Sequence, residues 1–431
     1  MSAVAALSPE EIHEAIFAMG RKARQAAHAL AVLGTDQKNA ILRAMAKEMR
    51  ARSAEILEEN AKDLAAAEAN GLTKAMIGRL SLDEGNVEAI ANGIEQVAGL
   101  PDPCGEVLDE RTRPNGIRIQ QIRVPIGVIG IIFESRPNVT SDAAVLCLKS
   151  GNATILRGGK EAIHSNLAIA AALQAGGEKA GLPENAIQLI PFTDRESVKE
   201  MASMDRYLDL IIPRGGKGLI ETVVSLARMP VIKHYDGICH VLVDEAADQR
   251  MAQDIVIDAK TQKPGVCNAL ETLLVHEAVA REFLPAVAER LKARGVELRG
   301  CEKTLAILGE AAVPATGEDW SAEYLDYILA IKVVGSLNEA VAHINEYGSQ
   351  HTDCIVTKEE ATAERFLREV DSACVHHNVS TRFSDGEEFG FGAEIGISTD
   401  KLHARGPMAL RELTSYQYRV RGEGQVKAPV E

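Results

Sequence analysis

From Pro125 onwards the sequence alternates between short β-rich runs and helical segments, and this alternation constrains the fold more than any other feature. The segments read, in order, "IGVIGIIF", "DAAVLCLKSG", "ATILRG", "EAIHSNLAIAAALQAG", "AIQLIP", "ESVKEMASM", "YLDLIIP", "GKGLIETVVSLA" and "VIKHY". Strands that alternate with helices form a parallel sheet whose two faces are covered by those helices. We therefore predict an α/β fold for this part of the chain.

The same alternation begins again after Cys267. The later segments read "LETLLVHE", "AREFLPAVAERLKARG", "YILAIKVVG", "LNEAVAHINEYG", "DCIVTK", "ATAERFLREV" and "ACVHHN". We expect them to form a second parallel-sheet unit. The predicted domains are residues 1–105 together with 125–260, and residues 261–383.

Helices and a hairpin precede the first sheet. Ser8 and Glu11 have the spacing of a helix capping box, and Pro9 stands at the first helical position. The run "IRIQQIRVPIG", residues 117–127, alternates polar and apolar side chains, and we predict a β-hairpin over residues 106–124. The tail, residues 410–426, alternates in the same way in "TSYQYRVRGEGQV" and is predicted to pair with that hairpin.

Composition excludes several classes of protein. The 431 residues are 46% hydrophobic and 25% charged, which is typical of a globular protein with two or three domains. No segment offers the ~18 uncharged apolar residues of a membrane span, and the start "MSAVAALSPEEIHEA" lacks a basic n-region, so we expect a cytoplasmic protein without membrane contact. A formal net charge of −15 argues against nucleic-acid binding.

Two glycine-rich loops follow predicted strands of the first sheet. The first loop is "ILRGGKEA", with Arg157 and Lys160, and the second is "IIPRGGKGLI", with Arg214, Gly215 and Gly216. Parallel sheets bind ligands at the carboxyl ends of their strands, where helix N-termini present backbone N–H groups. Each loop alone is equally well explained as a solvated connection with a basic rim. Two such loops in one sheet favour a phosphate-rich ligand.

The charges in the first loop bear on the choice of cofactor. An acidic side chain after the adenosine-binding strand selects NAD, whereas cations there accept the 2′-phosphate of NADP. Because Arg157 and Lys160 are cations, NADPH is the expected dinucleotide.

Cys267, in "KTQKPGVCNAL", has three open interpretations: a packing residue, a metal ligand or a nucleophile. The chain has seven cysteines without C-x-x-C pairs, so neither a disulfide framework nor a metal site is indicated. Cys147, in "AAVLCLKSG", fits a buried packing thiol.

The order of these motifs resembles the aldehyde dehydrogenase superfamily across nearly the whole chain. More narrowly, the chain is similar to the gamma-glutamyl phosphate reductase family. The motifs that carry the narrower resemblance are "FESRPNVTSDAA", "ILRGGKEA", "PRGGKGL", "GVCNALETLLVH" and "VHHNVSTRFSDGEEFGFGAEIGIST". The resemblance implies an aldehyde dehydrogenase-like fold of two α/β domains, the first of which binds NADP and the second of which is catalytic. The small hairpin element, with the tail strand, is then expected to mediate a homo-oligomer.

The resemblance also implies an activity. It implies NADPH-dependent reduction of L-glutamate 5-phosphate to L-glutamate 5-semialdehyde with release of phosphate, a step of proline biosynthesis, with glutamate 5-kinase as a candidate functional partner. Cys267 is then the nucleophile, Glu323 holds the nicotinamide ribose, and Arg157 and Lys160 form the adenosine-ribose pair. The rival interpretations are an acyl-CoA-linked or hydrolytic aldehyde dehydrogenase and a non-catalytic nucleotide-binding homologue.

The chain departs from the superfamily at two places. Aldehyde oxidisers carry E-L-G-G before an acidic strand, and that glutamate activates water, whereas this chain has "HYDGICHVLVDEAAD" with His234 at the position. The P-W-N turn, whose Asn lines the oxyanion hole, is replaced by "ESRPN", in which either Asn138 or the region of Ser135 is the substitute.

Substrate contacts are expected from two segments. A phosphate and an amino-acid head require cations and amide donors, for which the candidates are Arg136, Asn378, Ser380, Thr381 and Arg382. Each of them is also explained as a loop residue that satisfies its own turn. His376 and His377 are expected to pack at a strand end and not to bind a ligand.

Overall fold

The computed structural model describes residues 8–427, apart from the side chain of Ala75, and these residues form two compact units. Unit 1 comprises the chain up to Ile232, residues 391–396 and the chain from Met408 onwards. Unit 2 comprises Lys233–Gly390 and residues 397–407. The expected absence of a secretory signal rests partly on residues 1–7, which lie outside the described residues, as does the very start of the predicted first domain.

Unit 2 begins earlier than the boundary expected at residues 260/261. Strand β7 (Cys239–Val243) pairs in parallel with β8 (Leu270–His276) on one side and with β12 (Thr352–Val356) on the other. The first strand and helix of unit 2 therefore precede Cys267. Their apolar pattern continues that of unit 1, so the sequence shows no break between the two sheets.

Unit 1 opens with five helices. The predicted capping box is confirmed: the Ser8 side chain accepts from the Glu11 N–H, and the Glu11 carboxylate accepts from the Ser8 N–H. The helices are α1 (Pro9–Leu30), α2 (Thr35–Ala51), α3 (Ser53–Ala69), α4 (Lys74–Leu80) and α5 (Glu84–Gly99). They account for the helical start that the sequence predicts.

The sheet of unit 1 has the strand order β5-β4-β3-β6, and all its pairs are parallel. Its strands and the helices that follow them are β3 (Val128–Phe133), α6 (Asn138–Lys149), β4 (Ala153–Arg157), α7 (Ile163–Glu178), β5 (Ile187–Leu189), α8 (Glu196–Ala202), β6 (Leu210–Arg214) and α9 (Lys217–Leu226). Every residue of the first three of these strands is buried, so helices cover both faces of the sheet. The parallel α/β prediction is confirmed.

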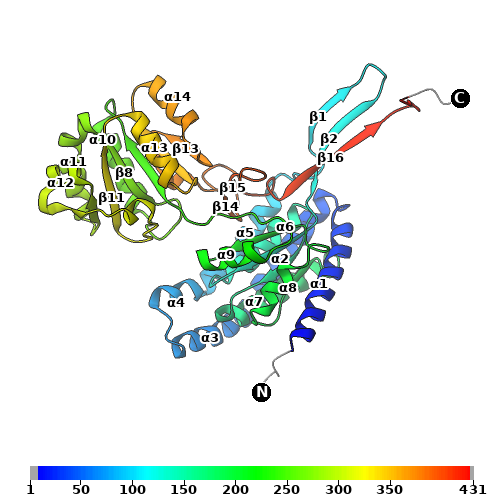
Figure 1. Ribbon diagram of the computed structural model, residues 1–431. Coiled ribbons are helices and arrows are strands. Elements are labelled where there is room, and N and C mark those ends of the chain that lie inside the picture. The colour runs from blue at the N-terminus through cyan, green and yellow to red at the C-terminus, as the bar shows by residue number, and fades with distance from the viewer. Residues whose placement is uncertain (1–7, 428–431) are drawn as a thin grey trace. The chain divides into compact units, whose positions relative to one another are not determined.

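Three antiparallel strands of unit 1 run side by side, and we call them the arm (Figure 1). They are β1 (Val107–Thr112), β2 (Arg118–Pro125) and β16 (Thr414–Arg421). The tail strand β16 pairs with β2 along its whole length, as predicted. Tyr416, Tyr418 and Val420 alternate along β16 and are all exposed, so one apolar face of the arm is open in the single chain.

Unit 2 is built around a parallel sheet of order β10-β9-β11-β8-β7-β12-β13. Its remaining elements are α10 (Gln249–Thr261), α11 (Glu277–Lys292), β9 (Glu297–Gly300), α12 (Glu302–Leu308), β10 (Val313–Pro314), β11 (Ile328–Val334), α13 (Leu337–Tyr347), α14 (Glu360–Glu369) and β13 (Cys374–His377). Two apolar clusters pack on the sheet, one beneath α10 and α11 and the other beneath α13 and α14. The short strands β14 (Gly396–Ser398) and β15 (Gly406–Met408) pair with each other.

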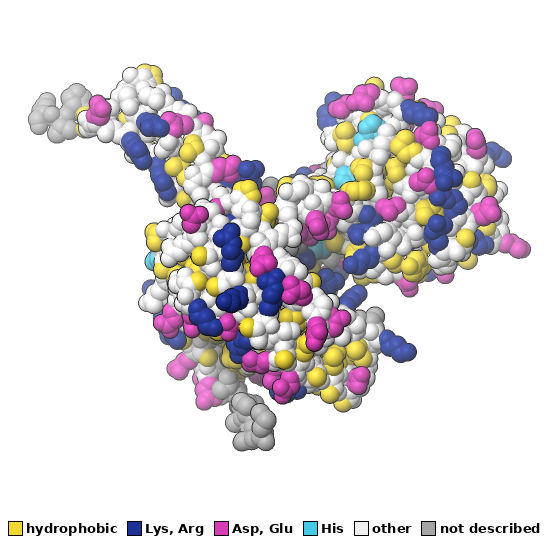
Figure 2. All heavy atoms as spheres, turned by 180° about the vertical axis from the view of Figure 1, so that it is seen from behind, with side chains coloured by type: hydrophobic (Ala, Val, Ile, Leu, Met, Phe, Trp, Pro, Cys, Tyr) yellow, Lys and Arg dark blue, Asp and Glu magenta, His cyan; other side chains and the backbone are white. Residues whose placement is uncertain are grey.

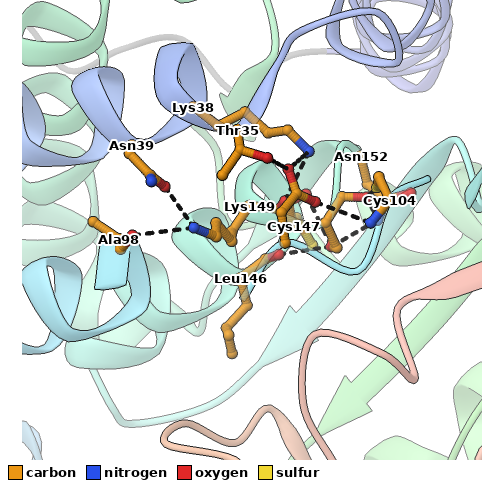
Figure 3. Close-up of polar contacts among 11 residues, drawn as sticks. Thr35, Lys38, Asn39, Ala98, Cys104, Leu146, Cys147, Lys149 and Asn152 are labelled. Atoms are coloured by element: carbon orange, nitrogen blue, oxygen red, sulfur yellow. Dashed lines mark hydrogen bonds and ion pairs between the residues drawn. The ribbon is translucent and has the colours of Figure 1, made fainter. Parts of the chain in front are cut away.

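Two lysines are fully buried in unit 1 (Figure 3). Lys38 forms an ion pair with Asp102 at 2.7 Å and donates to the carbonyl of Lys149. The Lys149 ammonium donates to Asn39 Oδ1 and to the carbonyl of Ala98. These contacts join α2, α5 and α6 to the segment that leads into the arm.

The surface carries charges of both signs. Figure 2 shows acidic and basic side chains interspersed on the face drawn, which offers no extended basic surface there for nucleic acid. Among residues 8–427, the helices are too short or too polar for any of them to cross a bilayer.

Candidate active site

Cys267 lies in the loop between α10 and β8, which we call the cysteine loop (residues 262–269). Its thiol is free and half-buried. The loop precedes β8, so the cysteine stands at the amino edge of the unit 2 sheet, together with the residues that lead into β7, β11 and β12.

Gly237 is the residue that lets the chain pass over the cysteine. A Cβ at Gly237 would lie 2.0 Å from the carbonyl oxygen of Cys267 and 2.5 Å from its Cα, so only glycine fits. The N–H of Gly237 donates to Glu323 Oε1 at 2.9 Å. The structure thus brings Glu323 to the segment that covers Cys267, and sequence reasoning missed this glycine.

A second thiol lies behind the first. Cys239 is buried at the start of β7, and its Sγ donates to the Cys267 carbonyl at 3.3 Å. Burial raises the pKa of Cys239 well above its ordinary value, so this thiol stays protonated. Cys239 therefore supports the loop, whereas Cys267 is the accessible sulfur of the two.

Residues 380–382, which the sequence predicts to bind the substrate, lie against the cysteine loop. Thr381 is buried and donates to the carbonyl of Asn268, and Arg382 donates to Asn268 Oδ1 and to Gln262 Oε1. Ser380 accepts from the Arg382 N–H as a cap of the short helix that follows. Thr381 and Arg382 therefore hold both ends of the loop.

Asn378 forms a turn of its own. Its backbone has a φ of +58°, and its side chain accepts from the N–H of Thr357 and donates to the Thr357 carbonyl. His376 lies buried at the end of β13 and contacts the Ser380 carbonyl at 3.2 Å, while His377 contacts the Thr357 carbonyl at 3.0 Å. Both histidines pack at the strand end, as expected.

His234 occupies the position at which aldehyde oxidisers are expected to carry a water-activating carboxylate. Its Nδ1 is 3.0 Å from the carbonyl of Ile397, so it donates a hydrogen bond there, and its ring meets that of His351 edge-on at 5.7 Å. The side chain is thus fixed in unit 2 by a backbone carbonyl.

In unit 1 the first glycine-rich loop follows β4. Lys160 is exposed, but Arg157 is only 9% exposed and donates to the carbonyl of Thr193 at 2.9 Å. Burial lowers the pKa of the Arg157 guanidinium. Arg157 therefore braces the segment before α8, and Lys160 is the cation of this pair that faces solvent.

The two glycines of this loop are buried and pack closely against neighbouring side chains. A Cβ at Gly158 would lie 2.1 Å from the buried Nδ2 of Asn166, and a Cβ at Gly159 would lie 2.2 Å from Glu161 Oε1. Within the described residues, Asn166 Nδ2 has no hydrogen-bond partner. A glycine backbone with a cation beside it fits an anionic dinucleotide.

The second loop ends at the first turn of α9. Gly215 and Gly216 are exposed, and the Gly216 N–H, at the helix N-cap, donates to Glu134 Oε2 at 3.0 Å. Arg214 is half-buried at the end of β6. A carboxylate thus already accepts at this helix N-terminus, as a ligand phosphate could.

The loop between β3 and α6 carries Arg136, and Asn138 is the first residue of α6; both are exposed. Asn138 Nδ2 donates to Asp142 one helical turn later, at 2.8 Å, and burial raises the pKa of Asp142 from 3.8 to about 6. Ser135 has a φ of +47° and donates through its N–H and its hydroxyl to Glu161, both at 2.7 Å. Asn138 therefore has an orienting partner, whereas Ser135 is used to hold the turn.

No group of three or more His, Cys, Asp or Glu side chains suitable for a metal ion occurs within residues 8–427. All seven cysteines are free thiols, and Cys147 is fully buried, with a pKa that burial raises to about 12. The interpretation of Cys147 as a packing residue is confirmed.

Comparison with known proteins agrees with this geometry. Residues 1–302 match the model of the aldehyde dehydrogenase family. The chain is 56% identical over 408 residues to the gamma-glutamyl phosphate reductase of Moorella thermoacetica, covering 95% of this chain and 97% of the relative. It is 54% identical over 418 residues to that of Geobacter metallireducens, covering 96% of this chain and 99% of the relative.

A solved structure extends the match to the fold. The crystal structure of gamma-glutamyl phosphate reductase from Thermotoga maritima aligns with a TM-score of 0.94 and 47% identity, covering 96% of this chain and all of that one. The chain therefore belongs to the aldehyde dehydrogenase family and, within it, to the gamma-glutamyl phosphate reductases.

Proposed function

We propose that this protein reduces L-glutamate 5-phosphate to L-glutamate 5-semialdehyde, with NADPH as reductant and release of phosphate, as a step of proline biosynthesis. The observation that carries the proposal is the environment of Cys267. Its thiol is half-buried, and the chain at position 237 passes so close to the backbone of Cys267 that only glycine fits there. The N–H of that glycine donates to Glu323. The names of the relatives at 54–56% identity support the substrate.

Cys267 supplies the covalent step. Its Sγ, as thiolate, attacks the acyl carbon of the substrate, the bond from that carbon to the phosphate oxygen breaks, and a thioester remains on the enzyme. The backbone N–H of Cys267 and the side chain of Asn138 are the proposed donors to the oxyanion. When bound, NADPH supplies the hydride that reduces the thioester. Sγ then leaves as thiolate while the aldehyde carbonyl forms.

Unit 1 supplies the proposed cofactor contacts. Lys160 is the cation for the 2′-phosphate, and Arg214, Gly215 and Gly216 line the second loop, where Glu134 must give way to an anion. Glu323 in unit 2 is proposed to hold the nicotinamide ribose. Arg157 is proposed to act by holding the carbonyl of Thr193, and not by a direct contact with the cofactor.

The hydrogen bonds of the candidate residues within the protein bear on which of them we propose to contact the substrate. Arg136 is the exposed cation of the "ESRPN" turn and is proposed to bind the phosphate. We propose that Thr381 and Arg382 act through the cysteine loop, because they bond to Asn268 and Gln262. Asn378 and Ser380 are proposed to act through the turns that they hold, at Thr357 and Arg382.

Two further features belong to the proposal. The arm offers exposed Tyr416, Tyr418 and Val420 and is proposed to assemble a homo-oligomer. Seven free thiols fit a reducing cytoplasm, where glutamate 5-kinase would be the functional partner that makes the acyl phosphate.

The test is an assay of NADP⁺ reduction with glutamate 5-semialdehyde in the presence and absence of phosphate. We expect turnover that requires phosphate and that is faster with NADP⁺ than with NAD⁺. Because His234 offers no carboxylate, water lacks a positioned base, which typically contributes about 10²–10⁴-fold. Undiminished turnover in phosphate-free buffer would contradict the proposal.

A further inference from the structure

Two buried charged residues flank the cysteine loop. Lys260 lies in the last turn of α10, before the loop, and Glu271 is the second residue of β8, after it. Lys260 Nζ and Glu271 Oε2 are 2.6 Å apart, and both side chains are 0% exposed. The ion pair therefore closes the base of the loop.

Stability alone is a poor explanation for this pair. Burial raises the pKa of Glu271 to about 7 and lowers the pKa of Lys260, so the surroundings oppose both charges while their mutual attraction favours them. Replacing a buried ion pair by apolar residues of similar volume is often neutral or stabilising. A charged pair at this place is better explained by the backbone segment that Glu271 binds.

The second oxygen of Glu271 holds a strained segment. Glu271 Oε1 accepts from the N–H of Leu325 at 3.2 Å, and Leu325, a residue that is 46% exposed, has a φ of +55°. A left-handed conformation disfavours a residue with a Cβ, and such a residue persists where its surroundings determine it. Lys260 Nζ also lies 5.8 Å from the centre of the Tyr324 ring.

The strained segment leads back to the cysteine. Glu323, two residues before Leu325, accepts from the N–H of Gly237, and Gly237 lies directly over the backbone of Cys267. The contacts form a closed ring from the base of the cysteine loop through Glu271, Leu325, Glu323 and Gly237 to Cys267.

We propose that Glu271, with Lys260 as its counter-ion, is a positioning residue that fixes the Glu323–Leu325 segment relative to the cysteine loop. The proposal rests on the proposed function for the roles of Cys267 and Glu323. Loss of the Leu325 anchor loosens the segment that carries Glu323 and, through the Glu323–Gly237 hydrogen bond, the chain over the backbone of Cys267, although neither Glu271 nor Lys260 reaches the surface.

The experiment compares two double variants that both lack the ion pair. Lys260→Met with Glu271→Gln keeps a side-chain oxygen that accepts from Leu325, whereas Lys260→Met with Glu271→Leu keeps the volume without an acceptor. We expect the Gln variant to retain a KM for NADPH within about twofold of wild type and the Leu variant to show a rise of about tenfold, the effect of one lost hydrogen bond. Alkylation of Cys267 by iodoacetamide, followed on its peptide by mass spectrometry, should be several-fold faster in the Leu variant.

Equal KM values and equal alkylation rates in the two double variants would overturn the proposal. A second measurement needs no variant: hydrogen exchange at the Leu325 amide of the wild-type protein should be slow, and exchange as fast as that of a free loop amide would also overturn it. If the wild-type protein fails to turn over glutamate 5-semialdehyde, the proposed function fails. The alkylation rates and the Leu325 amide still decide this inference.

Discussion

Both units of the molecule bury lysines, and Lys149 of unit 1 and Lys260 of unit 2 are held in different ways. Lys149 of unit 1 donates to neutral acceptors, Asn39 Oδ1 and the Ala98 carbonyl, between helices (Figure 3). Lys260 of unit 2 pairs with a carboxylate whose other oxygen binds the Leu325 backbone. The first arrangement joins packed elements, whereas the second ends at the segment that covers Cys267.

The difference shows that burial alone does not distinguish a structural charge from a positioning one. Replacing a buried cation that hydrogen-bonds only between helices is expected to change the stability of the protein and not the geometry of its site. A buried cation whose partner also holds a strained loop can change the geometry of a site without touching a ligand.

The largest effect is expected at Cys267. Cys267→Ala should lower turnover by at least about 1,000-fold, because the covalent step is lost, while NADPH binding measured by fluorescence stays near wild type. Cys147→Ala in unit 1 is the matched control, since that thiol is buried in packing, and it should keep its activity. Activity of Cys267→Ala within tenfold of wild type would show that another group is the nucleophile.

Gly237→Ala should break the site without removing a reactive group. The new Cβ would lie 2.0 Å from the Cys267 carbonyl oxygen, so the loop must move, and kcat should fall by about 100-fold. Gly93→Ala is the control in α5, where a Cβ meets no atom within 4 Å and alanine favours the helix. An active Gly237→Ala protein would mean that the cover over the cysteine is dispensable.

The two cations of the first glycine-rich loop should behave differently. Lys160→Ala is expected to weaken NADPH binding by roughly 10- to 100-fold and to leave NADH nearly unchanged, because a charge-assisted contact to phosphate is lost. Arg157→Ala should weaken both cofactors alike, since Arg157 braces the carbonyl of Thr193. Titration calorimetry with each cofactor measures this, and a selective loss of NADPH in Arg157→Ala would reverse the assignment.

Lys149→Met tests the structural case. It leaves Asn39 Oδ1 and the Ala98 carbonyl without their donor, which should lower the free energy of unfolding by about 1–3 kcal/mol in urea denaturation. The KM for NADPH and the alkylation rate of Cys267 should not change. A change in either quantity would show that Lys149, like Lys260, affects the geometry of the site.

The smallest effect concerns Asp142, which accepts from Asn138. Because burial raises its folded pKa from 3.8 to about 6, the folded state binds more protons than the unfolded state between these values, and stability falls as pH rises through them. Asp142→Asn keeps an acceptor and removes the titration, so it should be more stable than wild type by about 1–2 kcal/mol at pH 7.5. Urea denaturation at pH 5 and pH 7.5 measures the difference, which should shrink at the lower pH.

Sequence patterns predicted the elements better than their contacts. The βα alternation, the capping box at Ser8 and the pairing of the tail strand follow from local periodicity, which is visible in one chain. The start of unit 2 at Lys233 is not visible, because β6 and β7 have the same apolar pattern although they join different sheets.

Motifs give a signal for site residues that chemistry names, and none for residues that matter only through geometry. Cys267 and Glu323 were predicted from motifs, and their roles stay predictions. Gly237 matters only because the chain crosses the backbone of Cys267 there. Glu271 is a single charged residue in an apolar strand, and no sequence pattern indicates its partner. Arg382 has the chemistry of an anion donor, but the fold directs it to Asn268.

The central claim is that Cys267 carries the acyl group and that water does not release it. The most direct measurement mixes the protein with NADP⁺ and glutamate 5-semialdehyde in phosphate-free buffer, follows NADPH, and analyses the acid-quenched peptides by mass spectrometry. We expect a burst of NADPH equal to the number of active chains, a glutamyl adduct on the peptide that contains Cys267, and further turnover only when phosphate is added. Steady NADPH formation without phosphate, with free glutamate as product and no adduct on Cys267, would contradict the claim.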